Sequence, residues 1–247
     1  MSFDQSYNRS NQSSNSFLGL IHQKKQEQDH DSLLSQYELP LVTVDIVVFT
    51  VQDDRLKVLL IQRKRDPFKH MWAIPGGFIH MEESLKEAAV RHLRDETNIR
   101  DIFLKQLGAF GDPSRDPRAR VITVAYYALV SSDRLQPRAK DNAENIDWFC
   151  VTDLPDLAFD HHRVVDKSLK DLKDDLETSS IAFQLLPEKF TLTELQRVYE
   201  LILEKKLDKR NFRKKILAGG LLQDTNETKM DGYHRPAQLF AFVDNRK

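Results

Sequence analysis

A glycine loop that leads directly into an amphipathic helix is the feature that most restricts what this chain can fold into. The loop is Pro75-Gly76-Gly77, and the stretch 83–99 follows it. Within that stretch one helical stripe is free of charge, and the charged residues lie elsewhere. The stripe consists of Leu85, Ala88, Ala89, Leu93 and Thr97. The segment therefore predicts an amphipathic helix entered through a glycine loop.

The same segment has the parts needed to hold a pyrophosphate. Two glycines let backbone N–H groups approach an anion closely. Positions 92, 95 and 96 are three and four residues apart, so they are predicted to share one side of the helix. Carboxylates there would gather Mg²⁺ through oxygen ligands. The alternative is a plain core helix with a glycine-rich entry.

Strand-like segments surround this helix in the sequence. Two β-branched runs, 41–51 and 57–63, flank a polar turn, which is typical of a hairpin. Further strands are predicted at 121–130 and 146–151, and a helix from about His161 to Glu177. Strands and helices mixed without strict alternation predict an α+β domain of roughly 140 residues.

After residue 190 the pattern of apolar residues becomes helical. Thr191 to Glu194 form a capping box that starts a helix, and the segment before it, 177–190, is predicted to be a connection. The apolar positions of the helix follow helical spacing; they are Leu195, Val198, Tyr199, Ile202 and Leu203. A second helix after Leu207 ends at Gly219-Gly220, and two short strands, 220–225 and 237–242, follow. This order is that of a winged helix-turn-helix.

The second of these helices is strongly basic, although the whole chain is not. The chain has 37 Lys and Arg against 38 Asp and Glu, a net charge of -1, yet residues 205–215 carry seven basic residues and one acid. Arg210, Arg213 and Lys214 fall on the face opposite Phe212 and Ile216, as a groove-reading helix requires. The other candidate DNA contacts are Lys209, Asn211, Lys229, His234 and Arg235. The alternative is a solvated charged face, with Asn211 only capping the helix.

Several protein classes are excluded. No apolar run reaches the roughly 18 to 20 residues that span a bilayer, so an integral membrane protein is not expected. Cys150 is the single cysteine, and no charged segment followed by an apolar run opens the chain, which predicts a cytoplasmic location. The Ser- and Asn-rich residues 1–17 are predicted to be disordered, and residues 18–36 leave a short helix open.

The glycine loop and its helix resemble the Nudix box. Gly77, Glu83 and Arg91 are separated by five and seven residues, as in that motif, and His92 to Ile99 follow. His92 replaces the first metal-binding Glu of the family, Asp95 replaces the second, and Asn98 replaces the late Gly. The resemblance implies metal ligands at Glu83, Asp95 and Glu96. Imidazole is a poor Mg²⁺ ligand, so we expect binding without efficient hydrolysis, no catalytic residue and no required cofactor, with Mg²⁺ needed only if hydrolysis persists.

Segments outside the box resemble the branch of the Nudix fold that handles ADP-ribose. This resemblance implies a ligand site at Gly76 and Gly77, with arginines suited to phosphate and aromatic rings able to stack adenine. The arginines are Arg115, Arg118 and Arg120, and the aromatic residues are Phe68 and Trp72. The alternative for the arginines is an exposed loop that only aids solubility, and the alternative for the aromatic residues is packing in the core. His161 and His162 are expected to cap or pack.

A degraded Nudix box joined to the basic C-terminal segment resembles the NrtR family, Nudix-related transcriptional regulators of NAD metabolism. The resemblance implies a Nudix-like α/β/α sandwich with a mixed sheet at 38–180 and a winged helix-turn-helix at 181–247, after an N-terminal segment 1–37. It implies a homodimeric repressor of NAD biosynthesis or salvage genes that binds palindromic double-stranded DNA and responds to ADP-ribose. Two alternatives stay open: a Mg²⁺-dependent ADP-ribose pyrophosphatase, and a binding module with neither activity.

Overall fold

The computed structural model describes residues 37–99, 102–134, 143–230 and 236–243. The chain divides into two compact units at Pro40, and the second, Leu41–Lys247, contains all the elements below. The predictions for residues 1–36 and for His234 and Arg235 lie outside the described residues.

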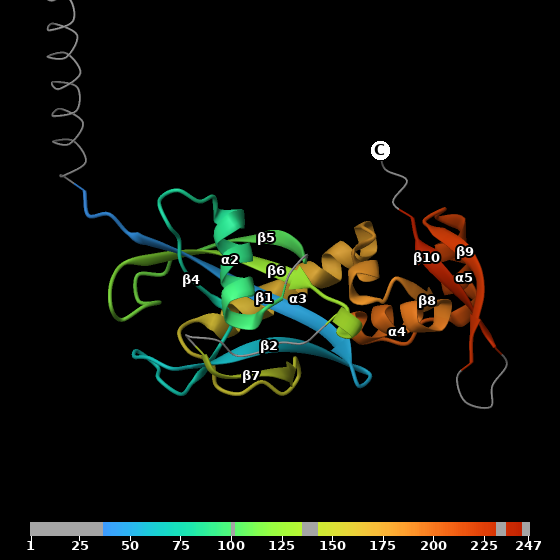
Figure 1. The fold of residues 1–247 in the computed structure, drawn as a ribbon, viewed down its shortest axis with the longest axis horizontal. Coiled ribbons are helices and arrows are strands. Elements are labelled where there is room, and N and C mark those ends of the chain that lie inside the picture. The colour runs from blue at the N-terminus through green and yellow to red at the C-terminus, as the bar shows by residue number, and fades with distance from the viewer. Residues whose placement is uncertain (1–36, 100–101, 135–142, 231–235, 244–247) are drawn as a thin grey trace, which may run out of the picture. The chain divides into compact units, whose positions relative to one another are not determined.

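A mixed sheet forms the larger part of the second unit (Figure 1). Its central strand β1 (Leu41–Gln52) pairs in parallel with β6 (Val121–Leu129) and antiparallel with β2 (Arg55–Arg63) and β4 (Gly76–Phe78). Strand β5 (Phe103–Phe110) extends the sheet beside β6, and β3 (Trp72–Ala73) and β7 (Ala143–Cys150) both pair with β2.

Two helices cover opposite faces of this sheet. Because side chains alternate along a strand, Val44, Ile46 and Val48 of β1 pack in the cluster that contains helix α2 (Leu85–Thr97). Val47 and Phe49 pack on the other face with helix α3 (His161–Thr178). Figure 1 shows α2 and α3 on either side of the strands. The predicted α/β/α sandwich with a mixed sheet is confirmed.

Local signals fix the ends of α2. Ser84 and Glu87 form a capping box at its start. At its end Asn98 adopts the left-handed conformation, with φ 61°, and its N–H donates to the Arg94 carbonyl at 3.0 Å. Asparagine is the residue that most readily replaces glycine in this conformation, so the departure from the Nudix pattern at position 98 leaves the helix end intact.

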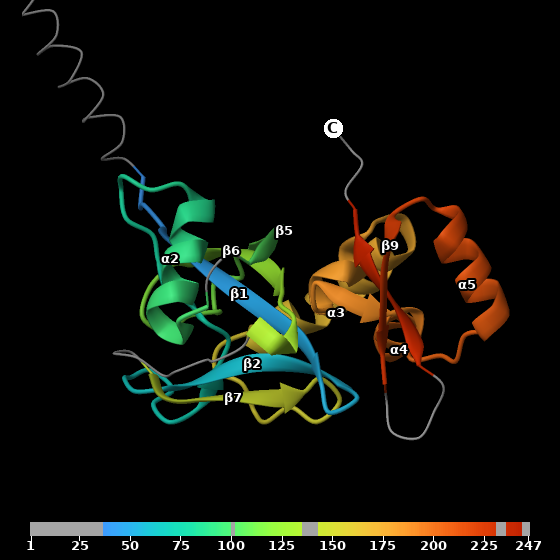
Figure 2. The same ribbon diagram turned by 45° about the vertical axis from the view of Figure 1, so that its right-hand side comes forward.

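The remaining elements form a winged helix. Strand β8 (Lys189–Thr191) leads into helices α4 (Leu192–Leu203) and α5 (Lys209–Ala218), and strands β9 (Leu222–Lys229) and β10 (Ala237–Phe242) follow them. The three strands form a sheet in the order β8, β10, β9. Thr191 and Glu194 make the predicted capping box, and Asp208 caps α5 by accepting from the Asn211 N–H at 2.8 Å. Figure 2 shows α5 on the outside of this group. The predicted winged helix-turn-helix is confirmed.

The segment between the sandwich and the winged helix is a core element, and the prediction of a mere connection was wrong. It contains a short 3₁₀ helix, η2 (Ile181–Leu185), in which four of five side chains are buried. Phe183 stacks on Phe242 at 4.4 Å between ring centroids and lies 5.6 Å from Phe190. One apolar cluster therefore runs from the sheet through η2 into α4 and α5. In the described part of the chain, no helix has the length and apolar content to cross a membrane.

Candidate functional site

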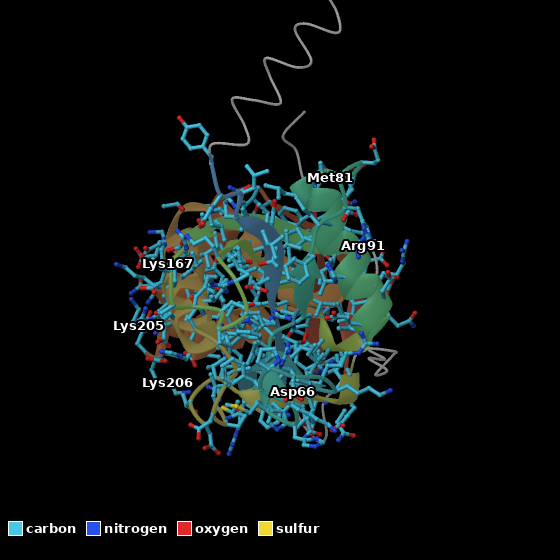
Figure 3. All side chains as sticks on the ribbon, turned by 90° about the vertical axis from the view of Figure 1, so that its left-hand side faces the viewer. Asp66, Met81, Arg91, Lys167, Lys205 and Lys206 are labelled. Carbon is cyan, nitrogen blue, oxygen red and sulfur yellow. The ribbon has the colours of Figure 1, made fainter. Side chains whose placement is uncertain are left out.

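A cavity of about 380 Å³ opens at the edge of the sandwich. Its wall combines β1, β2, the glycine loop, α2, the connection between β5 and β6, and the start of α3. Figure 3 labels two of its residues, Asp66 from the connection after β2 and Arg91 from α2. The predicted residues Gly76, Gly77, Glu96, Arg115 and Arg118 all line it.

The two glycines bring the chain close to β1 and to α2. Gly76 has φ 155°, and a Cβ there would lie 2.3 Å from the Val44 carbonyl oxygen. Its N–H donates to Glu96 Oε2 at 3.1 Å. A Cβ on Gly77 would lie 2.5 Å from Cε1 of His92. The loop is thus tied to the two inward-facing side chains of α2.

We expect Gly77→Ala to destabilise the chain by roughly 1–3 kcal/mol, the usual cost of overpacking. The added methyl group would displace the His92 ring from its hydrogen bond. Thermal unfolding measures this, with Gly111→Ala as control because a Cβ there meets only ordinary contacts, the nearest at 3.6 Å. The double variant Gly77→Ala/His92→Ala removes the ring that the new methyl group would meet, so it should recover part of the stability lost in Gly77→Ala. If Gly77→Ala alone were as stable as the wild type, the close approach of Gly77 to His92 would be refuted.

His92 occupies the place of a metal-binding carboxylate and makes a different interaction. Its Nε2 lies 3.0 Å from the Phe78 carbonyl oxygen, and its Nδ1 lies 3.6 Å from Glu96 Oε1. Burial lowers the pKa of His92, but Glu96 and the Phe78 carbonyl outweigh it, and the net pKa is raised. Both ring nitrogens therefore lie near oxygen acceptors of the chain rather than near an open metal position.

The three carboxylates proposed as metal ligands do not gather at one point. Glu83 is held by Arg91, at 2.5 and 2.8 Å, and this pairing lowers the pKa of its carboxyl to about 2. Asp95 is exposed and accepts from Arg94 Nε at 2.9 Å. Only Glu96 lines the cavity.

The expectation of one carboxylate face at 92, 95 and 96 was therefore wrong for Asp95. Positions 92 and 96 are one turn apart and share the buried stripe, whereas position 95 is rotated about 100° from its neighbour. Within the described ranges no group of three metal-ligating side chains occurs. The donor set does not fit a family-type Mg²⁺ centre.

The arginines of the β5–β6 connection divide into different roles. Arg115 is buried and donates to Asp160 at 2.8 Å and to Asp45 at 3.0 Å. Arg118 is exposed at the cavity and makes a double hydrogen bond to Asp116, at 3.0 and 2.7 Å. Arg120 donates to the Gly111 carbonyl at 2.6 Å and lies outside the cavity wall, so the solubilising-loop alternative describes it better.

The predicted aromatic platform was misplaced. Trp72 packs edge-on against Phe149 at 4.7 Å, and Phe68 packs edge-on against Phe159 at 4.8 Å; neither lines the cavity. Both rings fill hydrophobic clusters behind it. The rings that do line it are Phe78 and Phe159.

Most of the basic residues of α5 lie at the surface, and Arg213 does not lie fully there. Lys209, Arg210 and Lys214 are exposed, and Phe212 is buried on the opposite side. Arg213 is half-buried, and within the described residues its Nε has no hydrogen-bond partner.

Two other candidates for DNA contact are engaged inside the chain. For Asn211 this is the backbone only: its N–H donates to the N-cap residue Asp208, and its side chain is exposed. On the wing, the Lys229 ammonium donates to Glu194 Oε1 at 2.7 Å, and this contact lowers the pKa of Glu194 against the effect of burial.

Comparison with known proteins assigns both halves of the chain. The NUDIX domain model matches residues 40–171, and the NrtR DNA-binding winged helix domain matches residues 182–242. A curated protein of Acinetobacter baylyi, "ADPR responsive transcriptional repressor NtrR", is 38% identical over 213 residues, which cover 85% of this chain and 84% of that protein. The chain belongs to the NrtR family.

Solved NrtR structures share the architecture. Shewanella oneidensis NrtR complexed with a 27mer DNA matches 82% of this chain and 93% of its own, with 34% identity and a TM-score of 0.73. The NUDIX domain of the same protein complexed with ADP ribose matches 56% of this chain and 92% of its own, with 35% identity and a TM-score of 0.52.

Some cavity residues of this NrtR-family chain escaped the sequence reasoning. Arg63 donates to the Pro67 carbonyl at 2.9 Å and lies 4.7 Å from the centre of the Phe159 ring. Phe159 has φ 56°, an unusual conformation for a bulky residue. The basic run 63–65 at the end of a strand was a usable signal for Arg63. No spacing rule pointed to Phe159.

Proposed function

We propose that this chain is a transcriptional repressor of NAD biosynthesis or salvage genes that responds to ADP-ribose. In this proposal residues 38–180 form the ligand domain and residues 181–247 the DNA-binding domain. The observation that carries it is the match along both domains to a repressor described as ADPR responsive. Because a repressor must reach the chromosome, the proposal includes a cytoplasmic location, as in bacteria.

The charge of the cavity suits a diphosphate. Six basic side chains line it against four acids. The basic residues are Arg63, Lys64, Arg65, Arg91, Arg115 and Arg118, and the acids are Asp45, Asp66, Glu96 and Asp116. Arginine binds phosphate oxygens in paired hydrogen bonds. Phe159 and Phe78 supply flat faces for an adenine, in place of Phe68 and Trp72.

The DNA-binding surface is the exposed side of α5, with the β9–β10 wing beside it. In winged helix-turn-helix proteins the second helix enters the major groove, and a dimer reads two half-sites. We therefore propose a homodimer that binds palindromic duplex DNA. Arg210, Arg213 and Lys214 make the principal contacts, with Lys209 and Asn211 at the helix start. Lys229 reaches phosphate only by leaving Glu194, and the role of Arg235 stays a prediction.

Binding to duplex DNA should depend steeply on salt. Each phosphate neutralised by Lys or Arg releases counterions, so the logarithm of affinity falls linearly with the logarithm of salt concentration. Fluorescence anisotropy with a duplex selected from the source genome measures the slope for wild type and Lys214→Ala, and we expect the variant to reduce it by about one. A flat salt dependence in the wild type would argue against phosphate contacts.

The proposal includes binding of ADP-ribose without efficient hydrolysis. Only one of the three candidate metal ligands faces the cavity, and His92 occupies the position of a fourth. The alternative is a Mg²⁺-dependent ADP-ribose pyrophosphatase with an accessory C-terminal domain. It is supported by the NUDIX domain match and by a relative of Methanocaldococcus jannaschii named ADP-ribose pyrophosphatase, which is 38% identical over 135 residues, 53% of this chain and 76% of that protein. Mg²⁺-dependent release of AMP and ribose 5-phosphate at rates ordinary for an enzyme would favour that alternative.

Replacing His92 by glutamate should create a Mg²⁺ dependence of stability. The variant would place two carboxylates, at 92 and 96, one turn apart in a buried position, where like charges repel. We expect His92→Glu to have a lower melting temperature in EDTA and to recover it with Mg²⁺, measured by differential scanning fluorimetry. The control is His92→Gln, whose side chain has the shape of glutamate without its charge and should not respond to Mg²⁺. Equal melting temperatures of His92→Glu with and without Mg²⁺ would contradict this geometry.

A further inference from the structure

A buried charged cluster at the floor of the cavity joins the ligand site to the start of α3. Arg115 donates from Nη2 to Asp45 Oδ2 at 3.0 Å and to Asp160 Oδ1 at 2.8 Å, and from Nε to Asp160 Oδ2 at 3.2 Å. The side chains of the three residues are 4%, 8% and 11% exposed. Asp160 thus holds the guanidinium in the paired geometry that a phosphate would also use.

Arg115 has capacity left for a ligand. It lines the cavity, and within the described residues its Nη1 makes no hydrogen bond. Because a phosphate group accepts through several oxygens and carries more charge than a carboxylate, it competes with Asp160 for the rest of the guanidinium.

Asp160 has a second possible partner that it does not use in this structure. It occupies the N-cap position of α3, but its side chain makes no capping hydrogen bond, and its backbone lies at φ -98° and ψ 22°. An N-cap aspartate ordinarily has extended backbone and accepts from the second or third N–H of the helix, here those of His162 and Arg163. The Arg163 N–H donates to the Asp160 carbonyl at 2.9 Å in this structure, so a side-chain cap would use the His162 N–H or replace that backbone bond. Capping a helix is worth roughly 0.5–2 kcal/mol. If Asp160 were released from Arg115, its side chain could cap α3, and the backbone of the first turn of α3 would have to change for this.

Helix α3 extends from the cavity to the winged helix. Its 18 residues span about 27 Å at 1.5 Å per residue. Near its C-terminal end Asp175 accepts from Lys105 at 2.5 Å and from the Tyr127 hydroxyl, and Lys173 pairs with Glu204 after α4 at 3.2 Å. Leu172 and Leu176 share one apolar cluster with the inner residues of α4. A shift of the first turn of α3 therefore acts on an element packed against the DNA-binding domain.

We propose that Asp160 is the residue through which ligand occupancy reaches the DNA-binding domain. It exchanges Arg115, its partner in this structure, for the N-terminus of α3, which it caps when a diphosphate takes Arg115. This inference rests on the proposed function, because it needs both an anionic ligand in the cavity and DNA binding by α5. It assigns Asp160 a positioning role.

The decisive variant is Asp160→Asn in the full-length protein. Asparagine caps helices as well as aspartate does but cannot make a charged pair with Arg115, so the variant favours the capped state without ligand. Anisotropy gives the duplex-DNA Kd with and without ADP-ribose. Two-site coupling in proteins is typically about 5–150-fold, and we expect such an effect in wild type and less than about twofold in Asp160→Asn. The ligand-free variant should already have the DNA affinity of the liganded wild type and should bind ADP-ribose at least as tightly.

Asp112→Asn is the matched control, because it makes the same substitution at an exposed site in the connection that carries Arg115. It should keep the wild-type response. An unchanged response in Asp160→Asn, or loss of its ADP-ribose binding, would overturn the inference.

A second measurement needs no variant. Hydrogen exchange of wild-type peptides covering residues 158–165 should slow when ADP-ribose binds, and exchange at the first turn of α3 that does not change would overturn the inference. Failure of the proposed function looks different: wild-type protein then shows no DNA binding, or no ADP-ribose binding, before any comparison of variants.

Discussion

Replacing Arg213 by alanine should weaken binding to duplex DNA by roughly 1–3 kcal/mol, about 5- to 150-fold, which is the range for an arginine that contacts a base. Arg213 lies on the basic side of α5 between the exposed Arg210 and Lys214. Among the described residues its Nε is buried without a hydrogen-bond partner, so a base contact would have to be made by the terminal nitrogens of its guanidinium. Anisotropy titrations at fixed salt measure the effect.

The control for this prediction is binding of ADP-ribose. The cavity is built from β1, β2, α2 and the start of α3, and no residue of α5 lines it. Calorimetric titration should therefore give the same ADP-ribose affinity for Arg213→Ala and wild type. Lys170→Ala, which removes an exposed charge from α3, should alter neither affinity. Unchanged DNA affinity in Arg213→Ala, or equal loss of both affinities, would contradict separate sites.

Replacing Phe190 by alanine should lower the free energy of unfolding by roughly 3–5 kcal/mol, the usual cost of removing a large buried ring. Phe190 is 1% exposed and packs in the cluster that contains both Phe49 of the sheet and Leu195 of α4. Because this cluster is continuous, the residues from Leu41 onward should unfold in one transition that the variant moves as a whole. Urea denaturation followed by circular dichroism measures the change.

Leu217→Ala is the matched control for this prediction, because Leu217 is 50% exposed on α5. Its substitution should change stability by no more than about 0.5 kcal/mol. Two separate transitions in wild type, of which Phe190→Ala shifts only one, would contradict a shared core.

Most of the helix ends and helix faces can be predicted from residues that are close together in the sequence. The capping boxes at Ser84 and Thr191 and the stop at Gly219-Gly220 depend on a few neighbouring residues, so the sequence is enough to locate these helix ends. The same holds for the division of α5 into a buried side with Phe212 and a basic side. These features are set by hydrogen bonds and periodicity within one segment.

Features that depend on distant contacts were missed or misplaced. Trp72 is half-buried because it meets Phe149, which is far away in sequence, and the segment 181–185 is buried because α3, α4 and β10 pack around it. The outward position of Asp95 follows from which stripe of α2 the sheet covers. Arg115 is suited to phosphate by type, but its pairing with Asp45 and Asp160 joins three segments that no spacing connects.

The most direct test of the central claim is selection of genomic DNA fragments on the purified full-length protein, at fixed salt, with and without ADP-ribose. The account predicts enrichment of a few palindromic sites near genes of NAD metabolism and a clear change in that enrichment when ADP-ribose is present. Absence of enrichment in both conditions would contradict the repressor assignment, and enrichment that ADP-ribose leaves unchanged would contradict the response to the ligand.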